Sequence, residues 1–178
     1  MAIRIYKKYR SETIKIVKTN PYLLADTING IGFKTADEIA EKSGISIHSP
    51  ARIKSGIRYT LSLSAADGSV YLPKNELVSN SAHLLGIEDE YVEHELSEMQ
   101  FERKIQSEKT DNGQIIFLQA FYDAEVFTAK KLIELSVGYI SDDHDYDKDI
   151  AAYEKLMKIH LADNQRNAVK EAMTSGVL

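Results

Sequence analysis

The residues best suited to chemistry lie in the segment GIGFKTA (residues 30–36), which has a helix-forming stretch on either side. Two glycines separated by one apolar residue allow a tight turn that exposes main-chain N–H groups at the start of the next helix. These groups and the Lys34 ammonium suit a phosphate, and would hold a nucleic-acid backbone without reading its bases. Gly30, Gly32, Lys34 and Thr35 are therefore candidate DNA-binding residues. The alternative is that the glycines only form a tight corner between two helices.

Charge is distributed unevenly along the chain. The formal net charge of −5 over 178 residues argues at first sight against a nucleic-acid partner. Residues 1–60, however, carry eleven Lys or Arg against five Asp or Glu, whereas residues 61–178 carry eleven against 22. The candidate phosphate site therefore lies in a basic part of the chain, which favours nucleic acid as its partner.

Other kinds of reactive site are missing from the sequence. The absence of cysteine excludes disulfides and thiolate sites and fits a reducing compartment such as the cytoplasm. The histidines lack metal-site spacing, and no Walker loop or nucleophile elbow occurs. No stretch approaches the roughly 20 apolar residues of a membrane helix. We therefore expect no catalytic residue, no metal site and no membrane partner.

One acidic run partly matches a calcium-binding loop. Asp143, Asp145 and Asp147 fall at loop positions one, three and five, and Glu154 falls at position twelve. Lys148 occupies the position where the loop requires glycine. A solvated linker is the preferred interpretation of this run.

Apolar spacing and helix caps predict a mainly α-helical chain with a small β hairpin. Short helices on both sides of the glycine turn predict a helix-hairpin-helix unit over residues 1–48. Three more helices and a short strand at 70–73 precede two strands, at 104–108 and 114–119, joined by a Thr-Asp-Asn-Gly turn. That order is typical of a winged helix, so a winged-helix-like unit is expected over residues 49–138.

The remaining residues are expected to form a linker and one helix. The linker region covers residues 139–160 and includes a loop-like acidic stretch over 141–149. A helix from Asp163 to about Thr174 follows. The final Gly176-Val177-Leu178 is typical of the start of a buried strand, a place where a natural domain rarely stops. We therefore expect that the sequence was cut there.

Five segments, in this order, resemble the N-terminal region of bacterial RecD-like ATP-dependent DNA helicases, relatives of the exodeoxyribonuclease V alpha subunit. They are RIYKKYR (4–10), NPYLLADTINGIGFKTADEIA (20–40), SPARIKSGIRYTL (49–61), VYLPKNEL (70–77) and LADNQRNAVKEAMTSGVL (161–178). Arg10 departs from the pattern, because glycine is expected after the first helix.

The resemblance implies a superfamily-one motor that moves 5′ to 3′ on single-stranded DNA and uses ATP and magnesium. Residues 161–178 would be the first helix of the motor domain, with the phosphate loop after Leu178. The fragment itself is then expected to hold no cofactor and to hydrolyse no ATP. Gln165 matches the adenine-recognising glutamine of the family. Its alternative role is that of a solvent-facing helix residue.

Two functions from different classes remain open. In the main hypothesis this is an accessory region that binds DNA, single-stranded or at a junction, through backbone contacts beside the rest of the helicase motor. In the alternative it is a protein-docking module that orients the motor without contacting DNA. The alternative rests on the helix expected at 89–102, whose glutamates would repel phosphates. These are Glu90, Glu93, Glu95, Glu98 and Glu102.

Overall fold

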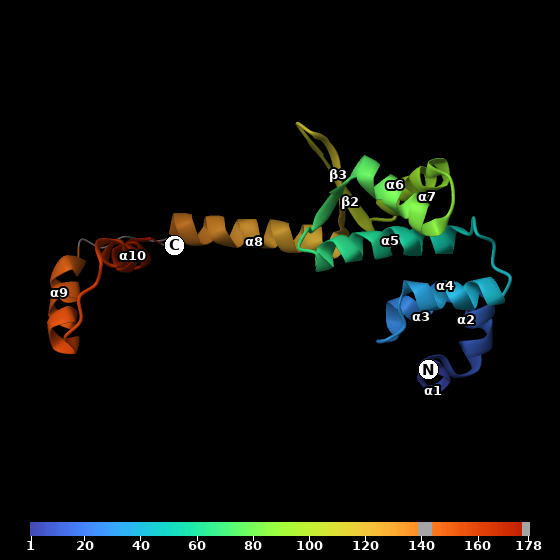
Figure 1. The fold of residues 1–178 in the computed structure, drawn as a ribbon, viewed down its shortest axis with the longest axis horizontal. Helices are drawn as coiled ribbons and strands as arrows, with labels where there is room; N and C mark the ends of the chain where they lie inside the picture. Colours follow the sequence, from blue (N-terminus) through green and yellow to red (C-terminus); the bar gives the residue numbers. More distant parts are fainter. Residues whose placement is uncertain (139–143, 176–178) are drawn as a thin grey trace. The chain divides into compact units, whose positions relative to one another are not determined.

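The computed structural model describes residues 1–138 and 144–175. It divides into two compact units, Met1–Tyr122 and Asp123–Leu178, which we describe separately (Figure 1). Within the described residues, no helix has the length and apolar composition needed to span a membrane. The predicted mainly α-helical fold with a small β hairpin is confirmed, and a third strand joins the hairpin in an antiparallel sheet.

The first unit begins with short helices around the glycine turn. They are α1 (Ala2–Tyr9), the 3₁₀ turn η1 (Arg10–Glu12), α2 (Thr13–Thr19), α3 (Tyr22–Thr27) and α4 (Phe33–Lys42). The amphipathic α1 buries Ile5 in a small cluster with Leu24, Ile28 and Ile31. The hairpin between α3 and α4 is therefore packed against α1 by its own apolar residues.

Arg10, the departure noted in the sequence, has an unusual backbone conformation. It ends α1 with φ +46° and ψ −118°. Glycine adopts these backbone dihedral angles without strain, whereas a residue with a Cβ is strained in them. The structure thus gives a physical reason for the glycine expected at this position.

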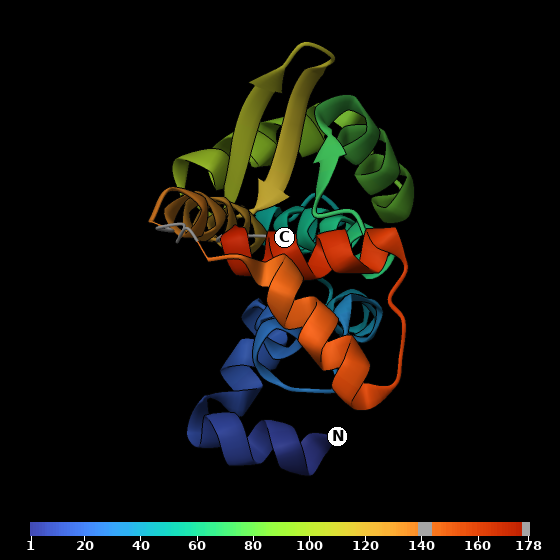
Figure 2. The same cartoon turned by 90° about the vertical axis from the view of Figure 1, so that its left-hand side faces the viewer.

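A larger set of elements completes the first unit. These are α5 (Pro50–Ala66), β1 (Tyr71–Pro73), α6 (Lys74–Leu85), α7 (Asp89–Phe101), β2 (Ile105–Thr110) and β3 (Gly113–Leu118). The three strands form an antiparallel sheet in the order β1-β3-β2, visible in Figure 2. Ser49 occupies the N-cap position of α5 without a side-chain hydrogen bond, and Pro50 takes the first helical position. Gly86 closes α6 in the left-handed conformation with φ +65°, and both helix boundaries are as predicted.

One hydrophobic core joins the hairpin helices to these later elements. It contains Tyr22 and Phe33 from α3 and α4, Ile53 and Ile57 from α5, and residues as far along the chain as Ile116 on β3. The division into units at 1–48 and 49–138 stays a prediction, and the structure groups residues 1–122 in one compact unit. The reason is that α3 and α4 are too short to bury their apolar side chains without α5.

The second unit contains most of α8 (Gln119–Gly138), α9 (Tyr146–Met157) and α10 (Asp163–Thr174). The acidic run expected to be loop-like is helical from Tyr146 onward, which corrects that prediction and removes the loop that a calcium site would need. The run can form a helix because Asp147 and Asp149 lie in its favourable first turn and Ile150 and Glu154 are buried. Asp143 and the predicted strand start at 176–178 lie outside the described residues.

Candidate nucleic-acid interface

The glycine turn is a tight corner whose conformation depends on Gly30. Gly30 has φ +89°, a value that glycine adopts without strain, and the Ile31 N–H donates to the Ile28 carbonyl at 3.1 Å across the corner. Ile28 and Ile31 are buried below it. The turn therefore has a single defined shape that presents its glycines outward.

The N-terminus of α4 is open to solvent at the end of this turn. Gly32 precedes the helix in an extended conformation, and no side chain caps it. A methyl group built on Gly32 would meet no atom of the described residues within 4 Å. Because the first N–H groups of a helix have no intrahelical acceptor, those of Phe33, Lys34 and Thr35 require an outside partner. This arrangement suits an anion such as a phosphate.

Side chains around the turn support this interpretation. Phe33 is buried and anchors the helix end, whereas Lys34 is exposed and Thr35 is half-buried. Gly30, Gly32, Lys34 and Thr35 thus lie together on one helix end, as expected from their proximity in sequence. Their role in binding DNA stays a prediction.

Arg4 is a further candidate that the sequence pattern did not single out. Its Nη1 donates to the Asn29 carbonyl at 3.4 Å and would lie 3.4 Å from a methyl group on Gly30. Arg4 comes from α1, twenty-five residues before Asn29. It brings a second cation to the turn beside Lys34. The only signal in the sequence was the basic character of residues 4–10.

A polar network fixes the hairpin helices on α5. The Tyr22 hydroxyl donates to Asp37 at 2.6 Å, and Arg52 donates to both carboxylate oxygens of Asp37 at 2.8 and 2.9 Å. Arg52 also donates to the carbonyls of Ile47 and Leu85. One guanidinium thereby joins α4, α5 and the end of α6.

Protonation states in this network follow from its contacts. Burial would raise the pKa of Asp37, but hydrogen bonds from Arg52 and Tyr22 outweigh it and lower that pKa. Burial, reinforced by Asp37, raises the pKa of Tyr22. At neutral pH the carboxylate is therefore charged and the phenol is protonated, which are the states that the hydrogen bonds require.

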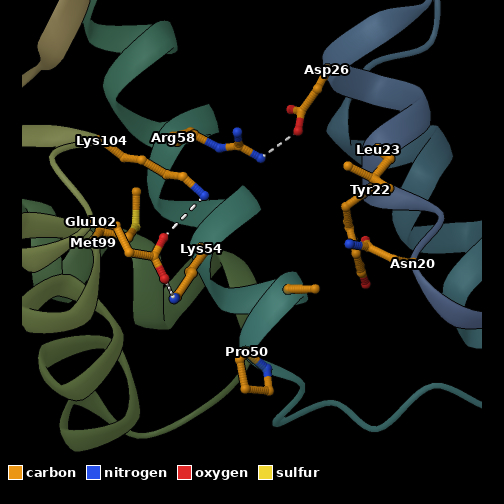
Figure 3. Close-up of a pocket in the computed structure, with 11 residues that line it drawn as sticks. Asn20, Tyr22, Leu23, Asp26, Pro50, Lys54, Arg58, Met99, Glu102 and Lys104 are labelled. Atoms are coloured by element: carbon orange, nitrogen blue, oxygen red, sulfur yellow. Dashed lines mark hydrogen bonds and ion pairs between the residues drawn. The ribbon is translucent and has the colours of Figure 1, made fainter.

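A groove of about 270 Å³ lies between α3, α5 and the end of α7 (Figure 3). Arg58 on α5 points to Asp26 on α3 at 2.9 Å, while Lys54 and Lys104 contact Glu102 at 2.6 and 3.0 Å. Hydrogen bonds from Lys54 and Lys104 lower the pKa of Glu102. No sequence motif predicts that Lys54, Arg58 and Lys104 lie together in this groove. The i, i+4 spacing of Lys54 and Arg58 predicts only that these two share one helix face.

The acidic helix α7 differs from what its sequence suggested. Glu95 is buried beside Lys54, and Glu102 binds two lysines. Of the five glutamates expected on this helix, four lie in α7 and Glu102 follows its last residue. Among the described residues, Glu90, Glu93 and Glu98 are exposed and have no ion pair. The expected repulsion of phosphates by all five is therefore wrong for Glu95 and Glu102, because Lys54 on α5 and Lys104 after α7 supply counter-charges.

Gln165 lies in the second unit, at the start of α10. Its side-chain oxygen accepts the Ala162 N–H at 3.0 Å, and the side chain is exposed. In this position the amide stabilises the helix start, and one oxygen lone pair and the NH₂ group remain for a ligand. In the described part of the chain, no group of three or more His, Asp or Glu is arranged to hold a metal ion.

Comparison with known families identifies the N-terminal part of the chain. Residues 1–71 match the family model described as the ATP-dependent RecD2 DNA helicase HHH domain, which spans α1 to α5 and reaches the start of β1. The match covers the open helix end, Arg4 and the Asp37–Arg52 network. Residues 1–71 are therefore a helix-hairpin-helix domain of the RecD2 helicase type, which supports an N-terminal RecD-like helicase region with a DNA-binding accessory role.

Proposed function

We propose that the hairpin binds the backbone of single-stranded or junction DNA, without sequence preference, for a cytoplasmic superfamily-one helicase that moves 5′ to 3′. The observation that carries this proposal is the uncapped N-terminus of α4, with Gly32 open to solvent and Lys34 and Arg4 beside the turn. The oxygens of a phosphate there accept hydrogen bonds from main-chain N–H groups. Because every nucleotide carries the same phosphate, these contacts do not depend on the base sequence.

The contacts imply weak and salt-sensitive binding. Two cations at the turn neutralise about two phosphates of a single strand, which corresponds to a roughly sevenfold loss of affinity between 50 and 200 mM salt. The hairpin thus holds DNA loosely enough for a motor to move along it.

A fluorescence anisotropy titration of the chain with labelled DNA at 50 mM salt tests this proposal. Gly32→Ala suits the test because the φ of −94° is accessible to alanine and the methyl group clashes with nothing in residues 1–138 or 144–175. We expect Gly32→Ala and Lys34→Glu each to weaken binding at least about fivefold. Lys42→Glu, at the far end of the same helix, is the matched charge control. Equal binding by Lys34→Glu and Lys42→Glu, or no binding by the wild type, would contradict the proposal.

The motor part of the hypothesis concerns α10. We propose that Gln165 binds the adenine edge of ATP once the rest of the motor is joined to this chain, with magnesium held by motor residues. Its remaining amide donor and acceptor capacity supports this role. Comparing nucleotide affinity of the full-length protein with that of Gln165→Ala, for ATP and GTP, tests it: unchanged preference would contradict it.

A second candidate function is supported by the exposed surface of α7. We propose that the winged-helix-like part of the first unit contacts the rest of the motor through Glu93 and Glu98, next to Phe101, which is 88% exposed. If docking is the only role, the double variant Glu93→Lys/Glu98→Lys does not bind a separately produced motor domain, which the wild-type chain does bind. In the same case, the wild-type chain binds no DNA.

A further inference from the structure

A second hollow, of about 290 Å³, begins at the hairpin itself. Gly32 and Phe33 at the start of α4 form one side of it, and α5 forms the other with Ser55, Arg58 and Tyr59. Gly32, the residue that opens the helix end to a phosphate, thus also lines this hollow. A strand held at the hairpin would therefore have a nucleotide next to it.

The walls combine aromatic and polar groups. Phe33 and Tyr59 stack with ring centroids 5.2 Å apart and an interplanar angle of 23°. Phe33 is buried, whereas Tyr59 is half-buried and keeps part of its surface open. Aromatic side chains of this kind are the surfaces on which proteins stack unpaired bases of any identity.

Ser55 supplies an unused polar group in the hollow. Its residue surface is only 4% exposed, and its hydroxyl makes no hydrogen bond to any residue in 1–138 or 144–175. Other hydroxyls of the same helix bond to the preceding turn, as in Thr60 to the Gly56 carbonyl and Ser62 to the Arg58 carbonyl. A hydroxyl that lines a hollow and has no hydrogen-bond partner among the described residues is suited to bond a ligand.

Arg58 adds a cation at the same place. Its Nη2 pairs with Asp26 at 2.9 Å, and about a third of its side chain is exposed. A guanidinium has five N–H donors, so several remain for a phosphate after one bond to Asp26. Arg58 also lines the groove of Figure 3, which continues along α5 from this point.

We propose that this hollow is a nucleotide subsite that takes one unpaired base of the strand bound at the hairpin. The base stacks on Tyr59 and bonds to Ser55, while the next phosphate contacts Arg58. The volume lies at the low end for ligand pockets and suits one base but not a base pair. A base in duplex must first be unstacked to enter, so the subsite gives a preference for single-stranded DNA. This inference rests on the proposed function of the hairpin.

Anisotropy titrations of the full chain with three labelled oligonucleotides of equal length test the subsite: a single strand, the same strand with abasic positions, and a duplex. We expect the base-containing strand to bind at least about fivefold more tightly than the abasic one. Ser62→Phe places a ring at the exposed mouth of the hollow. This variant should bind the base-containing single strand no more tightly than the abasic strand, and its affinity for the duplex should equal that of the wild type. Ser97→Phe is the control, because Ser97 is also an exposed helical serine bonded four residues back, to the Glu93 carbonyl.

Equal affinity for base-containing and abasic strands, or equal behaviour of Ser62→Phe and Ser97→Phe, would overturn the subsite. If Gly32→Ala still weakens all three complexes in that case, the hairpin function stands and only the subsite fails. If Gly32→Ala changes none of them, the proposed hairpin function fails as well.

Discussion

Removing the Arg52 guanidinium should strongly destabilise the first unit. Arg52→Met leaves the Asp37 carboxylate with only the Tyr22 hydroxyl and takes the charged donor from the carbonyls of Ile47 and Leu85. Breaking a buried pair costs about 3–5 kcal/mol. The two side chains are 13% and 25% exposed, so solvent screening reduces our expectation to about 2–3 kcal/mol. For a unit of this size, that lowers Tm by about 6–15 °C.

Thermal unfolding followed by circular dichroism at pH 7 measures this effect. Arg52→Lys keeps the charge but loses the two-point contact with Asp37, and should cost about 1 kcal/mol. Tyr22→Phe removes one hydrogen bond and should have a similarly small effect. A free energy of unfolding for Arg52→Met within about 0.5 kcal/mol of wild type would refute the reasoning. That result would mean that α3 and α4 stay on α5 by apolar packing alone.

Three further predictions concern pH, backbone conformation and the second unit. The folded-state pKa of Asp37 lies below its ordinary value of 3.8, so the Asp37 carboxylate stabilises the fold above pH 3.8 and loses this effect as the pH falls through the folded-state pKa. In urea titrations, the difference in unfolding free energy between wild type and Asp37→Asn should therefore become smaller at acid pH, and a constant difference would contradict this. Arg10→Gly should raise stability by up to about 1 kcal/mol in urea unfolding at neutral pH, since glycine adopts φ +46° without strain, and a loss of stability would count against strain at this site. In the second unit, the Leu161 N–H donates to Glu154 at 2.7 Å and Arg166 pairs with the same carboxylate, so Glu154→Ala should speed hydrogen exchange at Leu161, and unchanged exchange would show that this contact does not order the loop.

Local sequence signals located most helices and turns because those signals act over a few residues. Ser49-Pro50 began α5 and Gly86 ended α6 where they were expected, and the Thr-Asp-Asn-Gly turn joined β2 to β3. The helix α4 begins at Phe33, directly after Gly32, and the Phe33 ring is buried. Helix boundaries of this kind depend on packing that a local pattern does not contain.

The candidate site was predicted only where its residues are neighbours in the chain. Gly30, Gly32, Lys34 and Thr35 could be named together because one turn holds them. Arg4 could not be assigned to the same place, since only the packing of Ile5 on the hairpin brings α1 there.

By itself, the sequence determined the glycine hairpin, the basic character of its half of the chain and the resemblance to RecD-like helicases. The tertiary structure alone decided that the core joins the hairpin to α5 and that Glu95 and Glu102 face lysines. It also decided that Ser55 and Tyr59 lie beside Gly32. The physical reason is that turns and caps are formed within a few residues, whereas a counter-charge or a pocket wall arises when distant segments bury their apolar faces together.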